Sequence, residues 1–99
     1  MSVGFRWDPI KAATNLKKHR VTFTEASTVF SDPLARIFLD ETHSDHERRE
    51  ILIGWSHQGR LLLVSFIEVA PDQIRIISAR LANRRERRRH EEEKHEIGP

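Results

Sequence analysis

The sequence contains no cysteine among its 99 residues. A disulfide framework and a thiolate zinc site are therefore excluded, and a reducing compartment is the default expectation. No run approaches the roughly 20 apolar residues that a membrane-spanning helix needs. The N-terminus also lacks the apolar core of a secretory signal. We therefore expect a cytoplasmic protein that does not bind a membrane.

The chain is also too short for two separate cores. We expect one domain over residues 1–99, with 92–99 as a frayed tail. The composition is 37% hydrophobic and 32% charged, which is globular but more ionic than the average domain. The net charge is only +2, yet the charges are segregated along the chain. Residues 84–90 hold five arginines and one glutamate, whereas 40–50 are acidic.

The N-terminal third carries the signals of two helices. Asp8-Pro9 supplies a cap and a first-turn proline before a narrow apolar stripe through residues 9–18. Thr22 followed by Glu25 is a capping box, which predicts a second helix that starts directly after Thr22. Asp32-Pro33 ends that helix, because the residue before proline avoids the helical region. The two helices are thus joined by a short connection.

The C-terminal third predicts a third helix of unusual composition. Asn83 and Glu86 repeat the cap spacing, and residues 84–94 are strong helix formers. The segment has almost no apolar face, and its glutamates oppose the helix dipole near the C-terminus. We expect this arginine-rich helix to fray after about His90.

Between these helices the periodicity changes to that of strands. β-Branched and aromatic residues alternate in short runs that turn residues separate, and the short connections favour antiparallel pairing. The expected strands are 35–39, 51–55, 61–67 and 74–80, with a weaker one at 4–7. The sequence therefore predicts an α+β fold: an antiparallel sheet of four to five strands, two N-terminal helices packed on it, and a C-terminal arginine-rich helix.

The strand at 74–80 carries arginines that continue into the third helix. Regular alternation places Arg75 and Arg80 on opposite faces, and an unpaired buried charge is strongly unfavourable. At least one of them must therefore find an acidic partner or a ligand. Arginine presents a planar fork of donors that matches phosphate, so we expect this strand, followed by Arg84 and Arg85, to form part of an RNA-contacting face.

Two further pairs carry candidate chemistry. Lys18-His19 ends the first helix, where lysine can neutralise a phosphate and histidine can move a proton near neutral pH. The alternative is a solvated basic helix terminus that favours the dipole. Glu47-Arg48 combines a cation with a carboxylate that can act as a base or hold an arginine in place. Its alternative is a strand-edge charge that discourages aggregation.

The remaining candidates are weaker in sequence. Arg60 lies beside a hairpin turn and can contact RNA, and Trp7 can stack on a base, although an indole is more often part of a core or lid. His43 and His46 resemble a metal pair but lack a third ligand. We therefore expect no metal and no cofactor.

Short segments spread over residues 5–88 form a pattern that is specific when taken together. They are Phe5-Arg6-Trp7-Asp8, Lys11-Ala12, Asn15-Leu16-Lys17-Lys18-His19, Val21-Thr22-Phe23, Glu25-Ala26, Val29-Phe30-Ser31-Asp32-Pro33, Glu47-Arg48, Ile53-Gly54, Arg75-Ile76-Ile77-Ser78-Ala79-Arg80, Ala82, Arg85 and Glu86. In these segments the chain resembles the BrnT family of type II toxin–antitoxin ribonucleases, which are small members of the RelE-like fold.

The resemblance implies a metal-independent endoribonuclease that inhibits translation and growth. It also implies a BrnA-type antitoxin, which neutralises a toxin pair in a heterotetramer with an antitoxin dimer and contacts operator DNA for both. The chain departs from the family pattern at two positions. Arg20 stands where a glycine is common, which questions the tight turn after the first helix, and His90 stands where a tyrosine is common.

A metal-free RNA cleavage needs a base for the 2′-hydroxyl, stabilisation of the phosphorane charge and an acid for the leaving oxygen. We hypothesise that His19 or Glu47 handles protons, and that Lys18, Arg48 and Arg80 stabilise the phosphate. The predicted RNA contacts are Trp7, Arg60, Arg75, Arg84 and Arg85. Two alternatives remain: a degenerate toxin that binds nucleic acid without cleaving it, and an arginine-rich helix that mainly docks an acidic protein.

Overall fold

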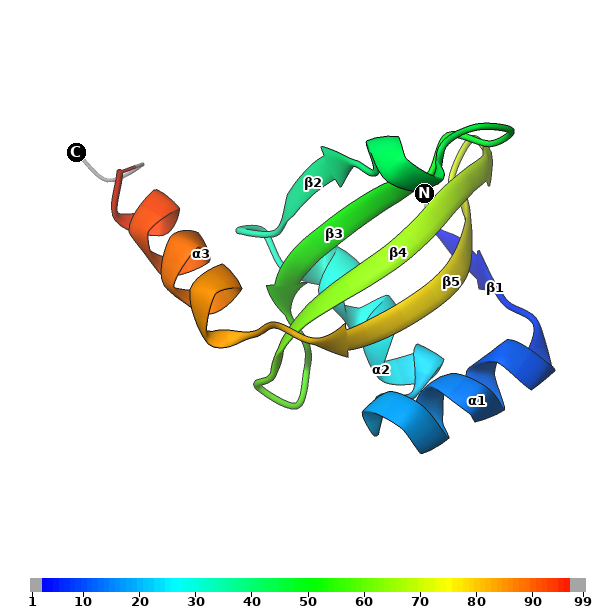
Figure 1. The fold of residues 1–99 in the computed structure, drawn as a ribbon, viewed down its shortest axis with the longest axis horizontal. Helices are drawn as coiled ribbons and strands as arrows, with labels where there is room; N and C mark the ends of the chain where they lie inside the picture. Colours follow the sequence, from blue (N-terminus) through cyan, green and yellow to red (C-terminus); the bar gives the residue numbers. More distant parts are fainter. Residues whose placement is uncertain (1–2, 97–99) are drawn as a thin grey trace.

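The computed structural model describes residues 3–96, with 93–96 described as backbone only. Five strands and three α-helices follow one another in the order shown in Figure 1. The elements are β1 (Gly4–Arg6), α1 (Pro9–His19), α2 (Phe23–Thr28), the short 3₁₀ turn η1 (Val29–Ser31), β2 (Arg36–Leu39), the 3₁₀ turn η2 (Glu41–His43), β3 (Glu50–Trp55), β4 (Leu61–Ala70), β5 (Gln73–Leu81) and α3 (Arg84–Glu96). The predicted α+β fold is confirmed.

The five strands form one sheet in the order β1-β5-β4-β3-β2. The four strands from β2 to β5 pair antiparallel in sequence order, as the short connections predicted. The weak N-terminal strand is real, but β1 pairs parallel to β5. A parallel pair is possible here because most of the chain separates the two strands and supplies the long crossover.

Local signals explain where α1 begins and ends. The Asp8 carboxylate accepts the Ile10 N–H at 2.9 Å, and Pro9 takes the first helical position. The helix ends at Arg20, which adopts the left-handed conformation with φ 60° and donates its N–H to the Leu16 carbonyl. The tight turn after α1 therefore forms without a glycine, although the left-handed conformation is strained for a residue with a Cβ.

The capping residue of α2 is also the one expected, although the predicted box is only half formed. The Thr22 hydroxyl accepts the Glu25 N–H at 3.0 Å. The Glu25 carboxylate turns inward, where it binds the guanidinium of Arg60 and accepts the Ser56 hydroxyl at 2.7 Å. This buried carboxylate joins α2 to the turn between β3 and β4.

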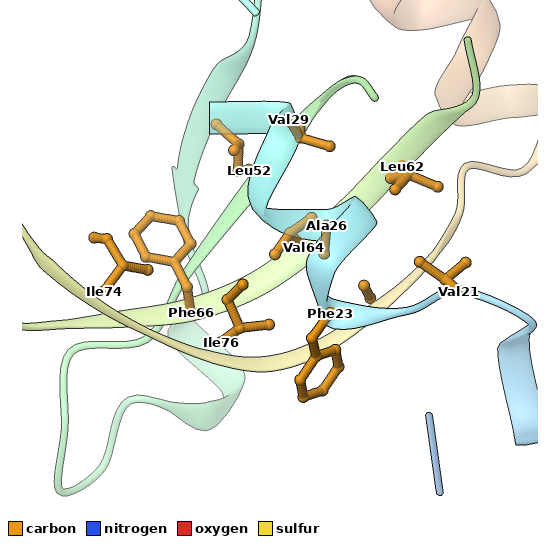
Figure 2. Close-up of a cluster of buried hydrophobic side chains, with 11 residues drawn as sticks. Val21, Phe23, Ala26, Val29, Leu52, Leu62, Val64, Phe66, Ile74 and Ile76 are labelled. Carbon is orange, nitrogen blue, oxygen red and sulfur yellow. The ribbon is translucent and has the colours of Figure 1, made fainter. Parts of the chain in front are cut away.

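The hydrophobic core lies between one face of the sheet and the N-terminal helices. Figure 2 shows side chains of α2 and η1 meeting those of β3, β4 and β5, and α2 lies behind the sheet in Figure 1. The core members are Val21, Phe23, Ala26, Val29, Leu52, Leu62, Val64, Phe66, Ile74, Ile76 and Ala79. The opposite face, called the open face below, does not pack against α2, and only the C-terminal end of α1 reaches its β5 edge.

A β-bulge changes which residues of β5 share a face. Arg75 pairs with Ile67 and Arg80 pairs with Leu63, and these two β4 residues are an even number of positions apart. They therefore point to the same side, and so do the two arginines. The prediction that Arg75 and Arg80 lie on opposite faces was wrong, because the ladder skips Ile77 and shifts the alternation by one residue.

Helix α3 begins with a complete capping box. The Asn83 side chain accepts the Glu86 N–H, and the Glu86 carboxylate accepts the Asn83 N–H, both at 2.8 Å. Although the helix has almost no apolar face, its first turns contact the sheet. The Arg87 guanidinium lies 5.0 Å from the centroid of the Trp55 ring, and the His90 side chain is buried.

The helical backbone of α3 extends to Glu96. We expected the helix to fray after about His90, but it continues to Glu96. His90 is buried, and this burial helps to hold the helix at that point. The rest of the predicted frayed tail, residues 97–99, lies outside the described residues. Among the residues that the structure describes, no helix is long and apolar enough to cross a membrane.

Candidate active site

Two rows of cross-strand neighbours make up the centre of the open face. One row joins Arg36, Ile53, Leu63 and Arg80, and the next joins Phe38, Ile51, Ser65 and Ser78. Ile53 and Leu63 fill the middle of the first row between two arginines, whereas the second row is apolar at its β2 end and carries two serines at its β5 end. The open face therefore carries polar and charged side chains next to apolar ones.

A hollow of about 290 Å³ lies over the β5 end of these rows. It is lined by His19, Ile51, Leu63, Ser65, Ser78, Ala79 and Arg80. Ser65 and Ser78 are cross-strand neighbours on β4 and β5, and both line the hollow together with His19 and Arg80. The structure therefore brings together His19 and Arg80, which are far apart in the sequence and were both predicted as catalytic. We call this hollow the cleft.

Helix α1 reaches the cleft because Asn15 holds it against β5. The Asn15 amide donates to the carbonyl oxygens of Ala79 at 2.8 Å and Val21 at 3.0 Å, and its carbonyl oxygen accepts the Ala79 N–H at 3.0 Å. Asn15 is buried and satisfies backbone groups at the edge of β5, where β1 has already ended. His19 stands one helical turn further along α1.

Lys18 lies next to the cleft. A second hollow, of about 250 Å³, is lined by Ile10, Lys11, Thr14, Asn15, Lys18, His19, Ile77 and Ser78. His19 and Ser78 line both hollows, so Arg80 shares the first hollow with them and Lys18 shares the second. Three of the five predicted catalytic residues are thus grouped in one place.

The Arg80 guanidinium is held by Glu86 from α3. Its two terminal nitrogens donate to the two carboxylate oxygens of Glu86, each at 2.9 Å. This hydrogen bonding lowers the pKa of Glu86 and raises the pKa of Arg80. The pair fixes the direction of the guanidinium at the mouth of the cleft. A phosphate that binds the Arg80 guanidinium must therefore compete with the Glu86 carboxylate.

The other two predicted catalytic residues lie elsewhere. Glu47 forms a two-pronged ion pair with Arg75, at 3.0 and 3.1 Å from one guanidinium nitrogen. This pair belongs to the open face but does not line the cleft. The side chain of Arg48 is 72% exposed and comes within 4.0 Å of Glu50. Glu47 thus holds an arginine, which is one of the two roles that the sequence suggested.

Arg60 and Trp7 lie on the helix side of the sheet, away from the cleft. Arg60 binds the buried Glu25 and donates to the Arg20 carbonyl at 3.1 Å. Hydrogen bonding from Arg60 lowers the pKa of Glu25. The Trp7 ring packs edge-on against Phe23, with centroids 5.9 Å apart. In this structure both predicted RNA contacts support the core.

The last two predicted RNA contacts, Arg84 and Arg85, lie on the exposed side of α3. Together with Arg88, Arg89 and Glu92 they line a shallow groove along the helix. The groove and the cleft are linked through Glu86, which belongs to the same helix as the groove and binds Arg80 of the cleft. The predicted continuity between the arginine strand and the arginine helix is therefore present in space.

Sequence reasoning missed the two cleft serines and the supporting amide. Ser65 interrupts the apolar run of β4, whereas β5 around Ser78 also carries arginines, so only the strand register shows that the two serines are neighbours. Asn15 has no such signal, because a buried amide inside a helix cannot be told from an exposed one by spacing. Phe38, at the β2 end of the serine row, was predicted only as part of a strand.

The histidine pair on the polar loop does not form a metal centre among the described residues. His43 binds the Asp40 carboxylate at 3.0 Å. No group of three or more histidine, aspartate or glutamate side chains gathers in metal-binding geometry in the part of the chain that the structure describes. The loop therefore contributes local ion pairing.

Comparisons with known proteins agree with this fold. The model of the family described as "Ribonuclease toxin, BrnT, of type II toxin-antitoxin system" matches residues 7–86. The crystal structure of the Brucella abortus ribonuclease toxin BrnT is similar, with a TM-score of 0.64 and 27% identity, over 84% of this chain and 100% of that one. No curated protein sequence matches. The matched residues include both sides of the cleft, and the chain belongs to the BrnT family of ribonuclease toxins.

Proposed function

We propose that this toxin is a metal-independent endoribonuclease whose active site is the cleft between α1 and β5. The observation that carries the proposal is the convergence of Lys18, His19 and Arg80 around Ser78. A histidine can move protons near neutral pH, and two cations, of which Arg80 is held by Glu86, can stabilise the negative charge of a phosphorane. Cleavage through the 2′-hydroxyl requires these two capabilities and no metal-bound water.

In this proposal the residues have separate roles. His19 exchanges the proton of the 2′-hydroxyl or of the leaving 5′-oxygen. Arg80 binds the scissile phosphate, sharing its guanidinium with Glu86, and Lys18 adds a second positive charge. Glu47 and Arg48 lie outside the cleft, and their catalytic roles stay predictions. Arg75 stays paired with Glu47 until a phosphate of the RNA takes the place of the Glu47 carboxylate.

The experiment is cleavage of a labelled RNA by the purified toxin, with and without a strong chelator. We expect cleavage that the chelator does not change, and a loss of about 100-fold or more for His19→Ala or Arg80→Ala, since acid–base and charge-stabilising groups each contribute on that order. His57→Ala and Arg6→Ala are the matched controls, because both remove exposed side chains outside the cleft. Activity that requires added metal, or that survives both cleft variants, contradicts the proposal.

A non-catalytic nucleic-acid-binding protein is the second candidate. It is favoured by one observation, namely that the fork of Arg80 is already occupied by Glu86. Such a protein binds RNA with strong salt dependence, through release of counterions, but leaves the strand intact. The chelator experiment separates the two candidates, because intact RNA in a salt-sensitive complex is the result expected for a degenerate toxin.

As a toxin of a type II system, the chain is expected to act with an antitoxin. We propose a BrnA-type antitoxin that forms a heterotetramer of two toxins with an antitoxin dimer and contacts operator DNA for the complex. The arginines of α3 support this, since they suit an acidic partner segment. Coexpression with the product of the adjacent gene tests it: relief of growth arrest and a stable complex are expected, and persistent arrest without a complex contradicts it.

A further inference from the structure

A second hollow on the open face lies beside the cleft and has a different character. It measures about 240 Å³ and is lined by Phe38, Ile51, Ile53, Leu63, Glu86, Arg89 and His90. Four of these side chains are apolar and come from β2, β3 and β4, and the other three come from α3. We call it the β2–α3 pocket. It forms where the first turns of α3 cover the β2 end of the open face.

The β2–α3 pocket and the cleft share their floor. Ile51 and Leu63 line both, and Glu86 on the pocket wall binds Arg80 on the cleft wall. The two hollows are therefore neighbouring sections of one surface that runs across the sheet from α1 to β2. A chain that placed a phosphate at Arg80 would extend over this pocket.

Two features of the pocket suit a nucleobase. Phe38 ends the serine row with a phenyl ring that is 42% exposed, which is a stacking surface for a flat aromatic group. His90 on the opposite wall is 3% exposed, and neither of its ring nitrogens has a hydrogen-bond partner. A buried polar group without a partner is costly. A base carries donors and acceptors on its edge and can supply that partner.

The charges around the pocket suit a nucleic-acid backbone. Arg80 lies on the side of β5, and the guanidinium groove of Arg84, Arg85, Arg88 and Arg89 lies on the outer side of α3. Proteins that hold single strands combine such a cationic track with aromatic side chains on which bases stack. The alternation of cations, an apolar aromatic pocket and further cations matches this arrangement.

We propose that the β2–α3 pocket binds one unstacked base of the RNA strand whose phosphate lies at Arg80, with Phe38 as its stacking partner. The proposal rests on the proposed ribonuclease function for its substrate, and it adds the residue that contacts a base. Phe38 is then a specificity-determining residue. His90 contacts the edge of the base and makes the pocket prefer some bases over others.

The test uses a short 2′-O-methyl RNA strand, which binds but cannot be cleaved, and versions of it with one base removed at a time. In wild type, removing one particular base weakens binding about tenfold, the magnitude typical of a stacked base, as measured by fluorescence anisotropy. Phe38→Ala weakens binding of the complete strand by a similar factor and abolishes the effect of the missing base. Phe38→Trp restores both.

Leu39→Ala is the matched control. Leu39 is the next residue on β2 and is also 42% exposed, but it points to the other face of the sheet. We expect it to change neither measurement. Arg85→Ala provides a second comparison. Loss of a phosphate contact weakens the binding of all strands alike, and it reduces the slope of log affinity against log salt concentration by about one.

The outcomes separate this proposal from the proposed function. If no missing base couples to Phe38 while RNA is still cleaved, the pocket proposal is overturned and the nuclease stands. If the coupling is present but no RNA is cleaved, the base site stands and the nuclease fails. If Phe38→Ala leaves RNA binding unchanged and weakens only the antitoxin complex, the pocket belongs to a protein partner, and the proposal is overturned.

Discussion

Asn15 pairs with the backbone of Ala79 as a neighbouring strand would, donating to its carbonyl at 2.8 Å and accepting its N–H at 3.0 Å. The pairing replaces β1, which ends at Arg6, along the second half of β5. Through it, α1 and β5 become one rigid unit. The distance between His19 on the helix and Arg80 on the strand is therefore set by a buried amide that touches neither of them.

The first prediction follows from this pairing. Asn15→Ala leaves the backbone groups of Ala79 buried without partners, so we expect a loss of about 1–3 kcal/mol in the free energy of unfolding. At a temperature where the variant is folded, kcat for RNA cleavage falls more than KM rises, because the cleft loses its geometry. Gln58→Ala removes an exposed turn amide as the control and should change neither quantity. An unchanged kcat in folded Asn15→Ala would show that the clamp has no role in catalysis.

The second prediction concerns the ion pair at the mouth of the cleft. Glu86→Gln removes the negative charge that lies 2.9 Å from the Arg80 guanidinium, so its fork is free to bind phosphate. We expect RNA affinity to rise by about fivefold, equivalent to a charge interaction of about 1 kcal/mol near a protein surface. Anisotropy titration measures it. Glu91→Gln, which alters the Arg87 pair on the same helix, is the control. A fall in affinity specific to Glu86→Gln would mean that the carboxylate mainly positions the arginine.

The third prediction concerns acid stability. The pKa of the buried Glu25 is lowered in the folded protein, chiefly by hydrogen bonding from Arg60. A lowered folded pKa means that the ionised carboxylate stabilises the fold above its unfolded pKa, near 4.3, and that this stability is lost as the pH falls through the folded pKa. Glu25→Gln should therefore be less stable than wild type at pH 7, and the difference should shrink in acid.

Chemical denaturation at a series of pH values measures this difference. Glu47→Gln is the matched control, because its carboxylate also pairs with an arginine but is half exposed, and exposed pairs contribute little. A difference between wild type and Glu25→Gln that stayed constant down to the acid transition would contradict the assignment.

The fourth prediction concerns the left-handed residue after α1. A residue with a Cβ at φ 60° is strained, and glycine is not, so Arg20→Gly should raise the free energy of unfolding by about 0.5–1 kcal/mol. The Arg20 carbonyl remains available to Arg60, since it belongs to the backbone. Lys17→Gly, inside the same helix, should lower the free energy of unfolding by a similar amount. Thermal unfolding of both variants gives the comparison, and a destabilising Arg20→Gly would show that its side chain contributes more than its conformation costs.

Local chemistry was sufficient to predict most elements from the sequence. The caps at Asp8, Thr22 and Asn83 mark helix starts, and each acts within three residues of itself. The strands and their antiparallel order follow from alternation and short turns. The resemblance over most of the chain added the family, which the match over residues 7–86 confirmed. The catalytic roles assigned to Lys18, His19, Glu47, Arg48 and Arg80 stay predictions.

What the sequence by itself determined is thus the set of elements and the residue types that can handle phosphate. Only the tertiary structure decided which of them meet. The bulge at Ile77 places Arg75 and Arg80 on one face of the sheet. Glu25 binds Arg60 on the core side. Asn15 holds α1 against β5, so that His19 and Arg80 line the same cleft. The physical reason is that capping and alternation act between near neighbours in the chain, whereas a buried polar group takes whichever partner the packed sheet and helices place within reach.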